Sequence, residues 1–291
     1  MTDPAAGFRC PLCGHRPATV RFKRSGIPVC ACGACGFVFA PAGAVIATRG
    51  PDDVFYSLDY FDGRADSGYA AYTDTLGALE RNAAHLLDAV LAARSARGCL
   101  LEVGSGAGQF LERAGPHFTR VYGVEICAGI CTRALPSNVT LFERRLETIL
   151  PSEMTAPADV IVLWDVIEHF PDPVAVMELL GRLAGPGCLI FLTTGNVASP
   201  LARLLGKRWR LMTPLEHYSF FAPSTIRKAA AAGGFQIEQI TSPWKWVPLV
   251  LVAAQLGRMF GAGRFAWRWV PRAWRVPLTL GDVMLVRGRH T

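Results

Sequence analysis

Short apolar runs alternate with helix-like segments through the middle of the chain. The runs cover residues 99–103, 121–124, 139–142, 159–164 and 188–194. Between them we predict helices over 107–114, over 126–135 and from Pro173 onward, where proline suits a first helical turn. This strand–helix alternation is typical of an α/β fold, with a doubly wound and mostly parallel sheet.

The pattern continues on both sides of this region. A helix is predicted from about Thr73 to Arg94, and another from Pro223 to Gly233-Gly234, followed by a strand over 235–240. Pro41 to Asp53 is rich in Ala, Gly and Pro and predicts a linker. Aromatic residues over 55–61 then suit either a lid over a ligand or the packing of this linker onto the domain. The long irregular stretch 195–221 is typical of a functional loop.

The first apolar run ends on Glu102 and enters a turn with glycines at 104, 106 and 108. Such a turn exposes the main chain to a ligand, although a tight strand–helix corner would need the same glycines. The dinucleotide pattern G-x-G-x-x-G requires glycine at 109, where Gln109 stands. The second run ends on Glu125, which is placed to accept hydrogen bonds from two ribose hydroxyls. A nucleoside ligand is therefore favoured over a dinucleotide.

Two C-x2-C knuckles, each followed by glycine, stand near the N-terminus. Four thiolates suit a tetrahedral Zn²⁺, and four protein ligands make a structural site. We predict a zinc ribbon over residues 1–40, with Cys30/Cys32 as an alternative second pair and the nearby basic residues as a rival nucleic-acid clamp. The expected ligands are Cys10, Cys13, Cys32 and Cys35.

Composition adds the compartment and the charge distribution. The chain has 291 residues, of which 51% are hydrophobic, and its nine cysteines follow no export leader, so we expect a cytoplasmic protein with thiols or metal ligands. The net charge is +7, and no acidic residue lies between Glu238 and Asp282. Five of the seven tryptophans fall in the segment 244–277. This basic insert suits either peripheral contact with the inner face of a membrane or an amphipathic helical pair packed on the domain or at a dimer interface.

The glycine turn, Glu125 and the segment 159–173 occur in this order, and together they resemble the class I S-adenosylmethionine-dependent methyltransferases. The second segment is similar to that of the ubiquinone O-methyltransferases and the zinc-bearing sugar C-methyltransferases. The resemblance covers 97–242 and 278–288, and it implies a Rossmann-like sheet with a terminal antiparallel strand over 280–287. The expected organisation is the zinc ribbon, a linker and N-terminal helical lid over 41–96, and a methyltransferase domain over 97–291.

The resemblance also implies which residues hold S-adenosylmethionine. Glu102 would fix the amino end, Glu125 the ribose, and Leu146 and Glu147 the adenine ring. The full set expected at the cofactor is Glu102, Gly104, Ser105, Gly106, Gly108, Glu125, Ile126, Leu146, Glu147, Trp164, Asp165 and Val166.

Three residues are candidates for work on the acceptor. Imidazole titrates near neutrality and can take a hydroxyl proton, which makes His169 and His217 candidate bases. Glu216-His217 matches a Glu-His pair that serves the substrate in the sugar C-methyltransferases. His169 has a second interpretation, as a cap of the helix that follows.

The sequence therefore predicts transfer of a methyl group to an oxygen, or a carbon, of a sugar, glycolipid or isoprenoid-like small molecule. A lipid-linked glycan at a membrane surface is one such acceptor. Two alternatives stay open. An RNA methyltransferase with a zinc ribbon is disfavoured, because the loop 164–167 lacks the Asn/Asp-Pro-Pro-aromatic motif of base N-methylation. A non-catalytic module that only binds the cofactor is the other.

Overall fold

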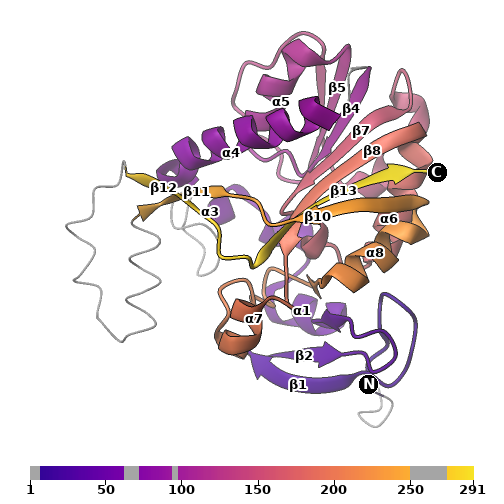
Figure 1. Cartoon of the computed structure of the whole chain (residues 1–291), viewed down its shortest axis with the longest axis vertical. Coiled ribbons are helices and arrows are strands. Elements are labelled where there is room, and N and C mark those ends of the chain that lie inside the picture. Colours follow the sequence, from indigo (N-terminus) through magenta and orange to yellow (C-terminus); the bar gives the residue numbers. More distant parts are fainter. Residues whose placement is uncertain (1–6, 62–71, 94–97, 250–273) are drawn as a thin grey trace.

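The computed structural model describes residues 7–61, 72–93, 98–249 and 274–291. Its centre is a seven-stranded sheet in the order β10-β13-β8-β7-β4-β5-β6 (Figure 1). The strands β4 to β8 are parallel, and β13 runs antiparallel to both of its neighbours, β8 and β10. This confirms the mostly parallel sheet with a terminal antiparallel strand. The bounds are Cys99–Val103 for β4, Arg120–Glu125 for β5, Val139–Glu143 for β6, Ala158–Trp164 for β7, Ala184–Gly195 for β8, Phe235–Thr241 for β10 and Val283–His290 for β13.

Alternate residues of the central strands build a core on each face of the sheet. In β4, Leu100 packs with the helices α4 (Tyr72–Ala93) and α5 (Gln109–Ala114), whereas Leu101 packs with α6 (Pro173–Leu183) and α8 (Pro223–Ala232). The two pairs of helices lie on opposite faces of the sheet (Figure 1). Because both faces are covered, the strands read as continuous apolar runs.

The N-terminal residues form a second, antiparallel sheet in the order β1-β2-β3-β9. Its strands are β1 (Thr19–Arg24), β2 (Ile27–Ala31), β3 (Val38–Phe39) and β9 (Ser219–Phe220). The last strand comes from the long segment between β8 and α8. The N-terminal sheet is therefore completed by a strand from the C-terminal half of the chain.

The segment predicted to be a linker is helical instead. It contains α1 (Ala42–Arg49) and leads into α2 (Asp52–Phe55) and α3 (Leu58–Phe61). Val45 of α1 is fully buried and packs in one apolar cluster with Ile27 and Val29 of β2. That buried contact outweighs the Gly and Pro content from which a linker was predicted.

The helix predicted over 126–135 is wrong. The chain there forms turns, with Gly129 at φ +79° and its N–H donating to Glu143 Oε1 at 2.6 Å. Arg133 forms ion pairs with Glu80 and Glu112, which tie this loop to α4 and α5. The remaining short elements are η2 (Gly115–His117), η3 (Leu146–Thr148), η4 (Pro151–Glu153), η5 (Ile167–His169), α7 (Pro200–Leu205) and η6 (Gly206–Arg208).

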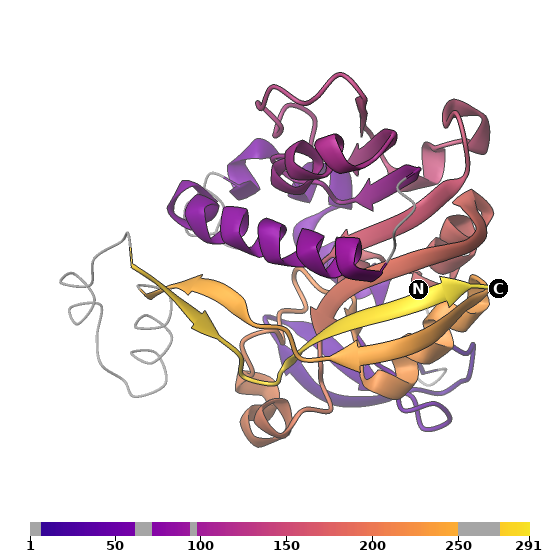
Figure 2. The ribbon, with the colours of Figure 1, turned by 45° about the horizontal axis from the view of Figure 1, so that its top comes forward.

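The two ends of the basic insert form strands and not helices. β11 (Lys245–Pro248) pairs with β12 (Arg275–Leu278), and this ribbon extends away from the central sheet beside α4 (Figure 2). Residues 250–273, on which most of the helical prediction fell, lie outside the described residues. Among the residues that are described, none of the helices combines the length and the apolar character needed to cross a bilayer.

Candidate functional site

The glycine turn after β4 has the backbone geometry that its sequence predicts. Gly104, Gly106 and Gly108 have φ values of +72°, +51° and +79°, which disfavour any residue with a Cβ. The Gly104 N–H donates to the Val124 carbonyl at 2.7 Å and ties the turn to β5. A Cβ on Gly104 would lie 2.5 Å from Val166 Cγ2. Both the backbone conformation and the contact with Val166 therefore require glycine at position 104.

Two carboxylates lie at the carboxyl ends of β4 and β5. Glu102 is 2% exposed, and burial together with the nearby Glu125 raises its pKa. Its Oε2 has no hydrogen-bond partner among the described residues. Glu125 accepts hydrogen bonds from Gly106 N at 2.8 Å and Cys127 N at 3.0 Å, while burial still raises its pKa. An orphaned buried carboxylate fits a ligand that brings positive charge.

A cavity of about 310 Å³ covers this edge of the sheet. It collects residues from β4, β5, β7, α4 and the N-terminal helices. Of the predicted cofactor residues, all but Gly108 line it, and so does His169; Glu216 and His217 do not. The predicted residues on its wall are Glu102, Gly104, Ser105, Gly106, Glu125, Ile126, Leu146, Glu147, Trp164, Asp165, Val166 and His169. Tyr56, Tyr60 and Trp244 add aromatic surface, so two of the aromatic residues ahead of α4 do face the cavity.

The loop after β7 carries backbone strain at the cavity. Asp165 has φ +57°, and its N–H donates to Thr193 O at 3.1 Å and Thr193 Oγ1 at 3.0 Å. Its carboxylate forms an ion pair with Lys245 of β11. Although desolvation opposes the effect, the Lys245 ammonium lowers the pKa of Asp165. A non-glycine residue held in this region is typical of functional sites.

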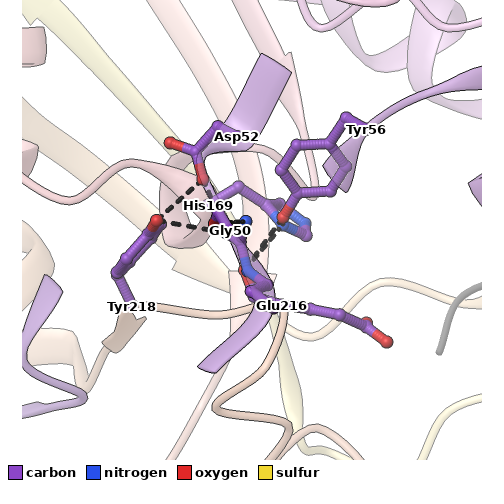
Figure 3. A network of polar contacts seen from close by, with 7 residues as sticks. Gly50, Asp52, Tyr56, His169, Glu216 and Tyr218 are labelled. Atoms are coloured by element: carbon purple, nitrogen blue, oxygen red, sulfur yellow. Dashed lines mark hydrogen bonds and ion pairs between the residues drawn. The ribbon is translucent and has the colours of Figure 1, made fainter. Parts of the chain in front are cut away.

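A network of polar contacts fixes His169 (Figure 3). Its Nδ1 lies 2.7 Å from the Tyr56 hydroxyl and 3.2 Å from the Glu216 carbonyl, which also accepts from Tyr56 at 3.0 Å. The Glu216 carboxylate points away from the imidazole, so this residue meets His169 through its main chain. The alternative role of His169 as a helix cap is wrong, because Asp172 Oδ1 accepts from the first N–H groups of α6.

His217 stands behind His169. The ring centroids are 4.8 Å apart, and His217 Nδ1 lies 3.0 Å from the Leu211 carbonyl. Burial, with a contribution from His217, lowers the pKa of His169 to about 3, and burial lowers the pKa of His217 to about 4. Burial and the neighbouring Asp165 raise the pKa of Glu168 to about 8. At pH 7 both imidazoles are therefore neutral and can accept a hydrogen bond, and the lowered pKa makes each a weaker base than a free imidazole.

Arg49, Asp52 and Tyr218 were not identified from the sequence. Arg49 Nη2 donates to Asp52 Oδ1 at 2.6 Å, and the Tyr218 hydroxyl donates to the same oxygen at 2.7 Å. This buried cluster fastens α1 and α2, and with them Tyr56, to the chain beside β9. Arg49 and Asp52 are only three positions apart, but Tyr218 lies 166 positions from Asp52, and the sequence has no signal for that contact.

The four predicted zinc ligands come together in the N-terminal sheet. Their sulfur atoms all lie within 4.8 Å of one another, with Cys10–Cys35 at 3.7 Å and Cys13–Cys32 at 3.5 Å. A tetrahedral ZnS₄ site with bonds of about 2.3 Å has sulfur–sulfur distances of about 3.8 Å. Gly14 N and Gly36 N donate to the Cys10 and Cys32 carbonyls, each at 2.9 Å, which closes the two knuckles. Cys30 is buried outside this group. The arrangement could hold a metal ion.

The strand order, the glycine turn and the cavity over the carboxyl ends of β4, β5 and β7 define a Rossmann-like methyltransferase fold. A family model described as a methyltransferase domain matches residues 76–240, which is more than half of the chain. The chain belongs to this family: it contains a class I S-adenosylmethionine-dependent methyltransferase domain, with S-adenosylmethionine as the methyl donor.

Individual relatives are distant. A ubiquinone biosynthesis O-methyltransferase of Xylella fastidiosa is 28% identical over 162 residues, covering 50% of this chain and 65% of the relative. One from Leptothrix cholodnii is 30% identical over 139 residues, covering 44% and 59%. The matches thus span less than two thirds of these relatives. A putative methyltransferase of Bacillus halodurans has a similar fold, with a TM-score of 0.53 at 15% identity, covering 72% of this chain and 100% of that one.

Proposed function

We propose that this protein transfers a methyl group from S-adenosylmethionine to an oxygen, or a carbon, of a sugar, glycolipid or isoprenoid-like small molecule. The observation that carries the proposal is the composition of the 310 Å³ cavity. One side has the glycine turn and two carboxylates, and the other has a fixed, neutral imidazole beside a tyrosine hydroxyl. This combination suits a cofactor on one side and a hydroxyl-bearing acceptor on the other.

On the cofactor side, each role follows from the state of the residue. The unpaired, buried carboxylate of Glu102 fits the cationic amino end, and Glu125 fits the ribose hydroxyls. Buried Leu146 and its neighbour Glu147 would border the adenine, while Trp164, Asp165 and Val166 would border the sulfonium. The bound cofactor supplies an electrophilic methyl group.

On the acceptor side, His169 is the proposed base. When Nδ1 carries the imidazole proton and donates it to the Glu216 carbonyl, Nε2 keeps a lone pair that can take the acceptor's proton. Tyr56 and the Glu216 carbonyl hold the ring in place. His217, whose Nδ1 faces the Leu211 carbonyl, supports the imidazole from behind and completes the pair with Glu216.

We also propose that the cluster of Cys10, Cys13, Cys32 and Cys35 binds a structural Zn²⁺. The knuckle geometry and the sulfur spacing support it. With four protein ligands, such an ion has no open position for water and takes no part in the chemistry.

Incubation with methyl-labelled S-adenosylmethionine and separated lipid, polysaccharide and RNA fractions tests the proposal. Label is expected in the lipid or the polysaccharide fraction. His169→Gln should lower the activity about 100-fold, which is at the low end of the range for loss of a general base. His117→Gln, in η2 and outside the cavity, is the matched control and should retain it. Label only in RNA, or equal activity of both variants, would contradict the proposal.

A further inference from the structure

We propose that the ribbon β11–β12, together with the flanking Trp244 and Trp274, docks the protein on an anionic lipid bilayer next to the mouth of the cavity. This inference deepens the proposed function by naming where the acceptor comes from, and it rests on that function only for the identity of the acceptor.

Two indoles on this ribbon face solvent. Trp244 is 58% exposed and Trp274 is 61% exposed, which is unusual for the largest side chain in proteins. They border the ribbon at opposite ends, since Trp244 precedes β11 and the Trp274 carbonyl accepts from Leu249 N at 2.8 Å just beyond Pro248. Indole rings favour the headgroup level of a bilayer, where an apolar ring and a wet N–H are both satisfied.

The charge around the indoles is complementary to anionic lipid. Lys245 and Arg275 lie on the ribbon, and the Arg81 guanidinium of α4 stacks over the Trp246 ring at 4.5 Å. The sequence contains no acidic residue between Glu238 and Asp282, so no carboxylate within that stretch opposes a negative surface. Asp165, in the loop after β7, forms an ion pair with Lys245 and offsets its charge. Basic residues near a membrane attract its anionic headgroups.

The ribbon is fixed firmly enough to hold the protein on a surface. Asn82 of α4 accepts from Trp246 N at 2.7 Å and donates to Trp246 O at 3.1 Å, as a neighbouring strand would. The ribbon forms its own two-stranded sheet and extends beside α4, away from the central sheet (Figures 1 and 2). The docking element is thus joined to α4, which lines the cavity.

The ribbon also reaches the cavity itself. The cavity wall includes Pro243, Trp244 and Lys245, which are far from the glycine turn in the sequence. Lys245 contacts Asp165 through an ion pair. A lipid-anchored acceptor could keep its chain in the bilayer while its headgroup enters between the ribbon and the N-terminal helices. The proposed docking surface and the methyl transfer site therefore lie next to each other.

Flotation of the full chain with vesicles tests the inference without any turnover. Binding is expected to phosphatidylcholine vesicles that contain phosphatidylglycerol, to be much weaker with phosphatidylcholine alone, and to fall with added salt. Trp244→Ser/Trp274→Ser should bind about tenfold more weakly, because two exposed indoles no longer enter the interface. Leu204→Ser, at an 82% exposed position on α7, is the matched control and should bind as the wild type does.

Two results would overturn the inference: no binding of the wild type to phosphatidylglycerol vesicles, or equal binding of the double variant in its folded state. Circular dichroism establishes folding, and Trp274→Ser alone, which lies off the cavity wall, provides a second variant with a smaller expected loss. If the protein methylates a soluble acceptor but does not bind vesicles, the result supports the proposed function and contradicts the proposed docking surface.

Discussion

At the scale of single residues, Gly104 is the position where sterics decide most directly. Gly104→Ala would place a Cβ 2.5 Å from Val166 Cγ2 at a φ of +72°. Because the turn must move to relieve this contact, we expect affinity for S-adenosylmethionine to fall by about tenfold or more, measured by isothermal titration calorimetry.

The matched control for this substitution is Gly129→Ala. Gly129 has φ +79°, but a Cβ there would meet nothing within 4 Å. It should cost roughly 1–2 kcal/mol of stability from the left-handed backbone alone and leave the affinity close to that of the wild type. Similar affinities for the two variants would show that the contact with Val166 does not shape the turn.

Glu102 should trade stability for binding. A carboxyl group whose pKa is raised by folding destabilises the folded state once the pH exceeds the unfolded pKa of about 4.3. Glu102→Gln should therefore raise the urea midpoint of the cofactor-free protein at pH 7, with the gain disappearing below pH 4. The same substitution should lower the affinity for S-adenosylmethionine about tenfold or more, because a charged hydrogen-bond acceptor is lost.

Urea unfolding at several pH values, with titration calorimetry beside it, measures both effects. Glu178→Gln, on the exposed side of α6, is the control and should change neither quantity. A lower urea midpoint for Glu102→Gln at pH 7 would mean that a partner within the protein already stabilises the buried carboxylate, and it would contradict this prediction.

Local sequence identified residues whose chemistry depends on their neighbours in the chain. Gly104, Gly106 and Gly108 were predictable because spacing fixes a turn, and the four metal-site cysteines because each knuckle is local. Tyr218 was not predictable, since its partner Asp52 lies 166 positions away in the sequence. Arg49 pairs locally with Asp52, but nothing in the sequence shows that the pair is buried. Glu216 was predicted to serve the substrate together with His217, and the contact that it makes with His169 is through its main-chain carbonyl.

At the scale of elements, the pairing of β3 with β9 connects the proposed zinc ribbon to the acceptor side of the cavity. β9 directly follows Glu216, His217 and Tyr218. Cys32→Ala should lose the bound zinc and, by loosening β9, lower both the thermal midpoint and kcat. Cys30→Ala, in the same sheet but outside the sulfur cluster, should keep one zinc per chain.

Metal analysis of the purified variants, followed by thermal unfolding, measures this prediction. Loss of zinc from both Cys32→Ala and Cys30→Ala would reassign the second ligand pair to Cys30 and Cys32, and retention of zinc by Cys32→Ala would contradict the prediction.

The cluster of Arg49 and Asp52 should behave as a buried ion pair that fastens α1 and α2. Their side chains are 3% and 10% exposed. Removing one partner leaves the other charge buried and unpaired, so Arg49→Met or Asp52→Leu should each cost about 3–5 kcal/mol. The double variant should cost clearly less than the sum of the two. A double-mutant cycle by urea unfolding tests this, and additive losses would contradict it.

The elements with a continuous apolar run were predictable from the sequence, and the elements that depend on contacts between distant residues were not. The strands from β4 to β8 follow directly from their apolar runs. The helix expected over 126–135 fails because Gly129 adopts a left-handed conformation and Arg133 is drawn to Glu80 and Glu112. α1 forms because Val45 is buried against β2, which no local pattern reveals.

At the scale of the whole molecule, three modules build or support one cavity. The central sheet supplies the glycine turn and the acidic residues. The N-terminal sheet holds the segment that carries Glu216 and His217, which contact His169 but do not line the cavity. The ribbon β11–β12, with the flanking Trp244, contributes Trp244 and Lys245 to the wall. The sequence predicted the first module and the cysteine cluster of the second. It did not predict that β9 joins them, because a two-residue strand has no recognisable pattern of its own.

The central claim is that this cavity binds S-adenosylmethionine, with the ribose held by Glu125 and the amino end by Glu102. A crystal structure grown with S-adenosylhomocysteine tests it most directly. The account predicts the nucleoside over the carboxyl ends of β4 and β5, with both ribose hydroxyls within hydrogen-bond distance of the Glu125 carboxylate. A product molecule bound elsewhere, or a cavity without it at saturating concentration, would contradict the account.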